Sequence, residues 1–143
     1  MTDGTATAPA PINAVVAMIR VADVVNAAKF YRHLGFEIGN AVPREGPVFN
    51  WAWLYQPSAP NWKTSANLML VSGEVPGTSQ SRAKTVLFYL YASNMKSLRE
   101  ELLAKGISVS EIFYPSYLPE GEFRVEDPDG YTLMIAQSGE DTP

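Results

Sequence analysis

The stretch of residues 21–36, VADVVNAAKFYRHLGF, decides the fold because it holds a complete helix between a start signal and a stop signal. Asp23 is a good N-cap, since its carboxylate can accept hydrogen bonds from the exposed N–H groups of the first turn. Apolar residues at helical spacing predict a helix over residues 24–34, which Gly35 ends in the left-handed conformation. The predicted buried stripe of this helix consists of Ala27, Phe30, Tyr31 and Leu34.

A strand is predicted immediately before this helix, over residues 15–21, because apolar and other side chains alternate there with a period of two. Ile19 and Val21 fall on one side of this strand. Val16, Met18 and Arg20 fall on the other side. The next strand begins directly after the helix, at Phe36.

The same arrangement occurs a second time, because a shift of 71 positions carries Asp23 onto Asn94 and Gly35 onto Gly106. An internal repeat of this length indicates two copies of one structural unit. Each copy reads as strand, helix and then three strands. The later predicted strands are residues 48–56 and 67–72 in the first copy, and residues 107–114, 122–126 and 131–137 in the second.

The sequence therefore predicts an α+β fold in which two βαβββ modules form one curved eight-stranded mixed sheet, with helices on its outer face and a concave cavity inside. We expect a single domain over residues 13–137, with module one at 13–72 and module two at 84–137. Residues 73–83, in a Gly-, Ser-, Thr- and Pro-rich stretch, are the predicted linker. Residues 1–12 and 138–143 are predicted to be flexible tails.

Composition narrows the chemistry that the chain can perform. The net charge of −4 and the pI near 4.9 argue against nucleic-acid and anionic-membrane partners, which need a basic surface. The chain has no cysteine, so disulfides and thiolate chemistry are excluded. It has one histidine, His33, and therefore no multi-histidine metal site. The start of the chain has no secretory pattern, and we expect a cytoplasmic protein.

Two motifs, in order, resemble the signatures of one known family. The first is Phe30-Tyr31 followed by Leu34-Gly35-Phe36, and the second is Asp127-Pro128-Asp129-Gly130 before the last strand. On these residues the chain, over about 13–137, resembles the glyoxalase/bleomycin-resistance/dioxygenase superfamily, which has the vicinal oxygen chelate fold. The resemblance implies a homodimer. It also implies a divalent metal in the members that are enzymes.

The family's metal ligands are His, Gln or Glu, and the matching positions of this chain hold none of these. By the resemblance these positions are Val16, Met69, Leu87 and Met134. Hard divalent cations need oxygen ligands, and Zn²⁺ needs nitrogen, oxygen or thiolate ligands. We therefore predict a site with no metal and no cofactor.

Aromatic side chains indicate what the cavity binds instead. Strand alternation puts Trp51, Trp53 and Tyr55 on one face, and an apolar, aromatic cavity with a few polar groups is typical of small-molecule pockets. Arg20 could pair with an anionic group of a ligand. The predicted ligand-binding residues are Arg20, Trp51, Trp53, Tyr55, Met69, Tyr89, Tyr91 and Met134. The alternative is that Trp51 and Trp53 pack in a dimer interface.

Three functions stay open on the sequence alone. The first is a binding protein for a small aromatic or anionic molecule. The second is an enzyme of the same superfamily (a lyase, isomerase or dioxygenase), with shifted metal ligands or with acid–base chemistry by Glu122 or Glu126 together with Tyr89. The third is a structural or regulatory dimer module.

Overall fold

The structure is a computed structural model that describes residues 12, 14–58, 65–73 and 86–139. The predicted linker from residue 74 onward and most of both predicted tails lie outside the described residues. Module one contains β1 (Met18–Val21), α1 (Val24–Arg32), β2 (Glu37–Val42), β3 (Trp51–Tyr55) and β4 (Asn67–Ser72). Module two contains β5 (Leu87–Ala92), α3 (Met95–Ala104), β6 (Glu122–Glu126) and β7 (Thr132–Gln137). The α+β fold class is as predicted.

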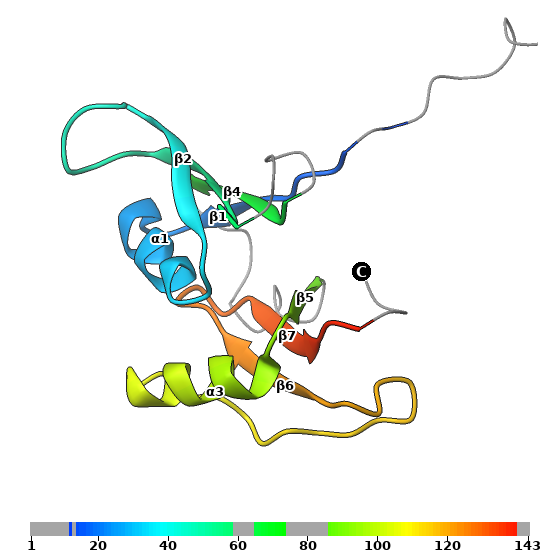
Figure 1. Cartoon of the computed structure of the whole chain (residues 1–143). Coiled ribbons are helices and arrows are strands. Elements are labelled where there is room, and N and C mark those ends of the chain that lie inside the picture. The colour runs from blue at the N-terminus through cyan, green and yellow to red at the C-terminus, as the bar shows by residue number, and fades with distance from the viewer. Residues whose placement is uncertain (1–11, 13, 59–64, 74–85, 140–143) are drawn as a thin grey trace, which may run out of the picture.

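Each module forms a sheet of its own, and Figure 1 shows module one, blue to green, above module two, yellow-green to red. The strand order is β1-β4-β3-β2 in the first sheet and β5-β7-β6 in the second. In both sheets the first strand of the module pairs in parallel with the last one. The strands β1 and β5 are therefore edge strands of their sheets.

The predicted repeat is confirmed in the helix caps. The Asp23 side chain accepts a hydrogen bond from the Asn26 N–H at 3.0 Å, and the Asn94 side chain accepts one from the Ser97 N–H at 3.0 Å. Both helices are followed by a glycine with positive φ, 93° at Gly35 and 79° at Gly106. Start and stop signals are thus equivalent in the two modules.

Strand register repeats as well. Met18 of β1 lies opposite Met69 of β4, and Tyr89 of β5, the repeat equivalent of Met18, lies opposite Met134 of β7. The same face of each sheet therefore presents matching rows of side chains. The family positions on the last strand of each module, Met69 and Met134, are structurally equivalent.

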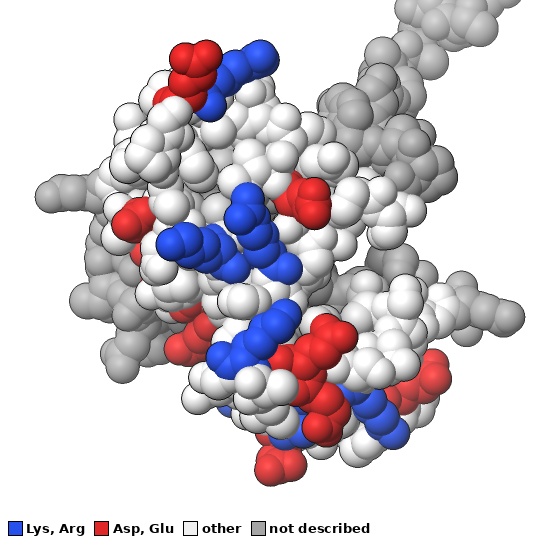
Figure 2. Space-filling model, turned by 60° about the vertical axis from the view of Figure 1, so that its left-hand side comes forward, with Lys and Arg blue, Asp and Glu red and all other residues white. Residues whose placement is uncertain are grey.

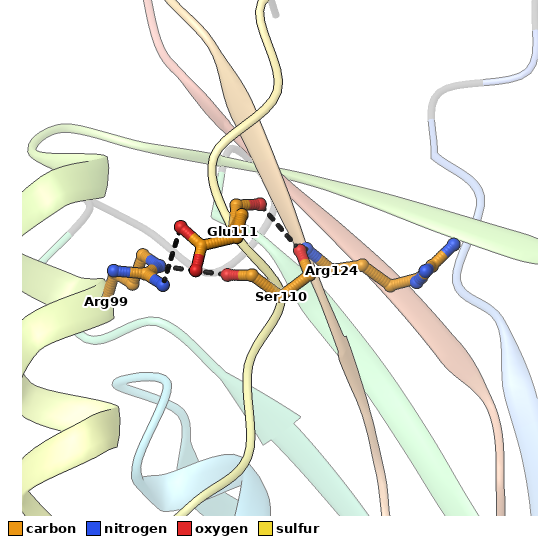
Figure 3. A network of polar contacts seen from close by, with 4 residues as sticks. All are labelled: Arg99, Ser110, Glu111 and Arg124. Atoms are coloured by element: carbon orange, nitrogen blue, oxygen red, sulfur yellow. Dashed lines mark hydrogen bonds and ion pairs between the residues drawn. The ribbon is translucent and has the colours of Figure 1, made fainter.

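The predicted eight-stranded sheet is not found, because the described residues form seven strands in two separate sheets. The predicted strand 107–114 makes only one isolated bridge, between Phe113 and Glu122. Backbone hydrogen bonds still link it to β6 at Ser110 and Phe113, while side chains occupy neighbouring backbone groups (Figure 3). The Arg124 N–H donates to Ser110 Oγ at 2.8 Å, and Arg99 Nε donates to the Ser110 carbonyl at 3.0 Å. Arg99 also lies 4.0 Å from the carboxylate of exposed Glu111.

One continuous apolar core joins the two modules, and a small polar cluster lies beside it. The Tyr31 hydroxyl donates to Asp127 Oδ2 at 2.7 Å, and the Ala22 N–H donates to Asp129 Oδ1 at 2.8 Å. The Tyr131 hydroxyl donates to the Arg20 carbonyl at 3.0 Å. The Asp127-Pro128-Asp129-Gly130 turn therefore fastens module two both to Ala22, just before α1, and to Tyr31 in the last turn of α1.

Burial changes the acidity of this cluster. It raises the pKa of Asp127 above its ordinary value, although hydrogen bonds from Tyr31 and two backbone N–H groups act in the opposite direction. Burial and the neighbouring Asp127 raise the pKa of Tyr31 well above its ordinary value. Tyr31 therefore acts as a hydrogen-bond donor across the neutral pH range.

Outside this cluster, charged side chains are spread over the surface. Figure 2 shows basic and acidic side chains next to one another over the lower part of the molecule, where module two lies. No helix in the described part of the chain is both long and apolar enough to cross a membrane.

Candidate functional site

The first candidate surface is the face of the first sheet that points away from α1. Along β3 the side chains alternate as predicted, with Ala52 and Leu54 buried in the core and the aromatic residues half-buried on the opposite side. Arg20 of β1 is exposed on the same side. We call this surface the module-one face, and its residues are Met18, Arg20, Trp51, Trp53, Tyr55 and Met69.

Trp53 is held in a defined orientation on this face. Its indole Nε1 donates to Asn67 Oδ1 at 2.6 Å, and its ring stacks on Tyr55 with centroids 5.0 Å apart and planes 10° apart. Gly39 of β2 lies against the same ring, and a Cβ at this position would collide with the indole. A rigid, half-exposed aromatic surface results, and such a surface loses little entropy when it binds a flat molecule.

The second candidate surface is the equivalent face of the second sheet. Tyr89 and Tyr91 of β5 lie opposite Met134 and Ala136 of β7, which in turn lie opposite Arg124 and Glu122 of β6. The two tyrosine rings stack with centroids 6.3 Å apart and planes 27° apart. We call this surface the module-two face, and its residues are Leu87, Tyr89, Tyr91, Glu122, Arg124, Glu126, Met134 and Ala136.

Glu122 differs from the other charged residues of this face because it is only 4% exposed, whereas Arg124 and Glu126 are exposed. The Tyr89 hydroxyl donates to Glu122 Oε1 at 3.5 Å, which is a long hydrogen bond. The pKa of Tyr89 is raised to about 12. The largest cause is its hydrogen bond with Tyr117, and desolvation and the charge of Glu122 contribute less. Tyr89 therefore keeps its proton at neutral pH.

The four positions that the resemblance assigns to the family's metal ligands hold side chains that do not fit a divalent cation. Met69 and Met134 supply thioethers, and Val16 and Leu87 supply only hydrocarbon. None of these side chains has an oxygen, nitrogen or thiolate donor, which Mg²⁺, Ca²⁺ and Zn²⁺ require. Within the described residues no group of three or more His, Cys, Asp or Glu side chains could hold a metal ion.

A hollow of about 650 Å³ lies between the modules, and its position was not foreseen from the sequence. Tyr89 and Tyr91 border it, whereas the other predicted ligand-binding residues do not. Its lining is mixed and includes the polar residues Gln56, Ser65 and Ser97. The larger aliphatic and phenyl side chains of the lining are Leu34, Phe36, Leu90, Leu98 and Ile135.

Pattern analysis missed this hollow because it forms between residues of different modules, and no single strand or helix shows it. The signal in the sequence is weak. Leu34 belongs to the predicted buried stripe of the first helix, and Leu98 is an apolar residue of the second helix, yet both are only half-buried. Such residues at the ends of apolar stripes can line a gap between two units.

Comparison with known proteins gives a consistent family and fold. The sequence profile of the Glyoxalase/Bleomycin resistance protein/Dioxygenase superfamily matches residues 12–135. No curated protein sequence matches the chain significantly.

Solved structures at low identity share the fold. TnmS3, an antibiotic binding protein from Streptomyces sp. CB03234, is 18% identical with a TM-score of 0.69, over 92% of this chain and 100% of that one. The bleomycin-binding protein of Streptomyces verticillus, complexed with copper(II)-bleomycin, is 17% identical with a TM-score of 0.62, over 92% and 100%. A superfamily member from Sphaerobacter thermophilus DSM 20745 is 17% identical with a TM-score of 0.66, over 90% and 98%. At these identities the similarity shows the fold alone.

Proposed function

The chain belongs to the glyoxalase/bleomycin resistance protein/dioxygenase superfamily, and from this premise we propose that it binds a small planar aromatic molecule without a divalent metal. The observation that supports this most is the orientation of Trp53 on the module-one face. Its ring is fixed by Asn67, Tyr55 and the absence of a side chain at Gly39, while the residue stays half-exposed. Such an aromatic surface favours stacking against a flat ring.

Two further observations support a binding role. The four positions that the resemblance assigns to the family's metal ligands hold side chains without hard donors, which argues against the polarising metal that the superfamily's enzymes use. Solved structures with the same fold include an antibiotic binding protein and a bleomycin-binding protein complexed with copper(II)-bleomycin. Binding of a small molecule is the function that the names of these proteins give, and the two aromatic faces of this chain suit a small molecule with a flat ring.

We also propose that the working unit is a homodimer. Met18 is 55% exposed and Leu87 is 56% exposed, and both lie at edge strands of their sheets. An edge strand with exposed apolar side chains is a surface that proteins normally cover. A second copy that covers β1 and β5 would bring two aromatic faces toward one ligand. A cytoplasmic location without nucleic-acid partners remains part of this proposal.

Binding can be tested by calorimetry with planar probes, namely naphthalene, anthracene and acridine derivatives of each charge. We expect at least one probe to bind, and Trp53→Ala to weaken it by about tenfold or more, as truncation of a central aromatic residue does. Leu103→Ala, which changes an exposed apolar residue of α3, is the matched control and should bind as the parent does. The proposal is wrong if no probe binds, or if both variants lose the same affinity.

The absence of a metal is tested separately. We expect the untagged protein, after incubation with Zn²⁺, Ni²⁺, Mn²⁺ and Fe²⁺ and desalting, to hold far less than one ion per chain by elemental analysis. A stoichiometric ion that survives desalting would contradict the donor argument. It would favour metal-dependent lyase, isomerase or dioxygenase chemistry instead.

Acid–base catalysis is a second candidate, which the contact between Glu122 and Tyr89 favours. A buried carboxylate beside a protonated tyrosine can move a proton within a bound ligand. Recovery of the bound probe tests this alternative by mass spectrometry and by deuterium exchange in D₂O. A binding protein returns the probe unchanged and undeuterated.

A further inference from the structure

The module-two face contains a negative charge that stacking of an aromatic ring does not use. Glu122 is 4% exposed, and a buried carboxylate is costly unless a cation or several hydrogen bonds compensate it. Within the described part of the chain no cationic side chain lies within ion-pair distance of Glu122. Among the described residues, its side chain accepts one hydrogen bond, the long one of 3.5 Å from the Tyr89 hydroxyl.

Strand register explains why this carboxylate lies under tyrosines. Tyr91, Ala136 and Glu122 form one row across β5, β7 and β6. Because the middle residue of the row is alanine, no long side chain separates the tyrosines from the carboxylate. The Tyr89 hydroxyl can therefore reach across β7 to Glu122.

The tyrosines give this carboxylate an aromatic surround that ligands can reach. Tyr89 is 41% exposed, and its ring stacks on that of Tyr91. The face of a tyrosine ring attracts a cation, and the attraction grows when the cation is partly removed from water. A nearby buried carboxylate adds to it, because a buried charge is screened less than an exposed one.

We infer that Glu122, Tyr89 and Tyr91 form a subsite for a positively charged group of the ligand, a quaternary ammonium or a protonated amine. The inference rests on the proposed function and adds the charge of the ligand to it. Arg124 lies on the same face but is exposed, so water screens its opposing charge. In Figure 3 its side chain extends away from the Arg99–Glu111 pair.

Three matched probes test this subsite on the full-length protein: (2-naphthylmethyl)trimethylammonium, its neutral isostere 2-neopentylnaphthalene and anionic 2-naphthylacetate. The ammonium and the isostere share one shape, so their affinity ratio measures charge recognition alone. By calorimetry we expect the ammonium probe to bind about tenfold more tightly than the isostere, with the anion weakest.

Glu122→Gln should bring this ratio close to one and leave the affinity of the neutral isostere unchanged. Glu126→Gln is the matched control, because it removes the same charge from an exposed position of the same strand face. Tyr91→Leu is a second variant, which leaves Glu122 intact and should lower the ratio about threefold by removing one ring.

The outcomes separate this inference from the proposed function. Equal binding of the ammonium probe and the isostere by the unmodified protein overturns the charged subsite and leaves aromatic binding standing. An equal loss of the ratio in Glu126→Gln shows an effect of net charge and also overturns the subsite. If none of the three probes binds but another planar probe does, the charged subsite is overturned and aromatic binding stands. If no planar probe binds, both proposals are wrong.

Discussion

The two modules share a plan but distribute their bulky side chains differently. The repeat carries Tyr31 of α1 onto Leu102 of α3, and the strand register makes Ala52 of β3 equivalent to Phe123 of β6. All four residues are buried in the common core. Module one thus has the large ring on its helix and the small residue on its sheet, and module two has the reverse.

This exchange shows what the repeat conserves. Cap residues and register stay equivalent because they set where each helix begins and which face each strand presents. Core side chains are free to change as long as the total volume between helix and sheet is filled. Tyr31 also has a second role, because its hydroxyl reaches Asp127 of module two.

The largest expected effect on stability is the loss of the ring at Phe123. Phe123→Ala should lower the free energy of unfolding by about 3–5 kcal/mol, because the surrounding core residues cannot fully fill the cavity that the ring leaves. Phe113→Ala, at an exposed phenylalanine, should cost less than about 1 kcal/mol. Chemical denaturation of both variants measures the difference. Equal costs would mean that Phe123 does not fill the core of module two.

The next largest effect concerns the contact between the modules. Tyr31→Phe keeps the ring but removes the hydroxyl, and it leaves buried Asp127 with one hydrogen bond fewer. We expect a cost of about 1–3 kcal/mol by urea denaturation. Tyr114→Phe, at an exposed tyrosine, serves as the control and should cost nothing measurable. A Tyr31→Phe protein as stable as the parent would contradict the role given to this bond.

The same cluster predicts a pH dependence with an unusual sign. The pKa of Asp127 is raised by burial, so the folded chain holds this proton more tightly than the unfolded chain does. Its contribution to stability is therefore greatest at low pH, and it falls as the pH rises from the ordinary aspartate value of 3.8 through the raised one. Subtracting the pH profile of Asp127→Asn from that of the parent should give a curve that declines over this window. A rising difference would contradict the prediction.

Local signals in the sequence predicted most of the fold. Both helices, their caps and the strands β4 and β6 were placed from alternation and from the Asp23 and Asn94 signals. The strand predicted at 107–114 was wrong, because the Ser110 side chain takes the Arg124 N–H and Arg99 takes the Ser110 carbonyl. The backbone bonds that remain at Ser110 and Phe113 therefore do not form a continuous ladder. Alternation cannot reveal such a competition, since it depends on residues that meet only in the folded chain.

Less of the candidate site than of the fold could be predicted from the sequence. The aromatic alternation of β3 is visible in the sequence, and the structure places Trp51, Trp53 and Tyr55 on one face. The burial of Glu122 beside Tyr89 depends on a row of three strands and on the short side chain of Ala136 between them. No single strand contains that information.

The smallest expected effect tests whether the two modules are equivalent in energy as well as in geometry. Asp23→Ala and Asn94→Ala each remove one cap bond of 3.0 Å, so each should cost about 1 kcal/mol. At low salt, Asp23→Ala should cost a few tenths of a kcal/mol more than Asn94→Ala, because the negative charge of Asp23 also interacts favourably with the helix N-terminus. Added salt should remove this difference. Asp23→Asn and Asn94→Asp, which keep a cap, are the controls.

One core joins both modules, so each variant should shift a single urea transition. Two separate transitions would mean that the modules unfold independently and that the Tyr31–Asp127 bond does not couple them.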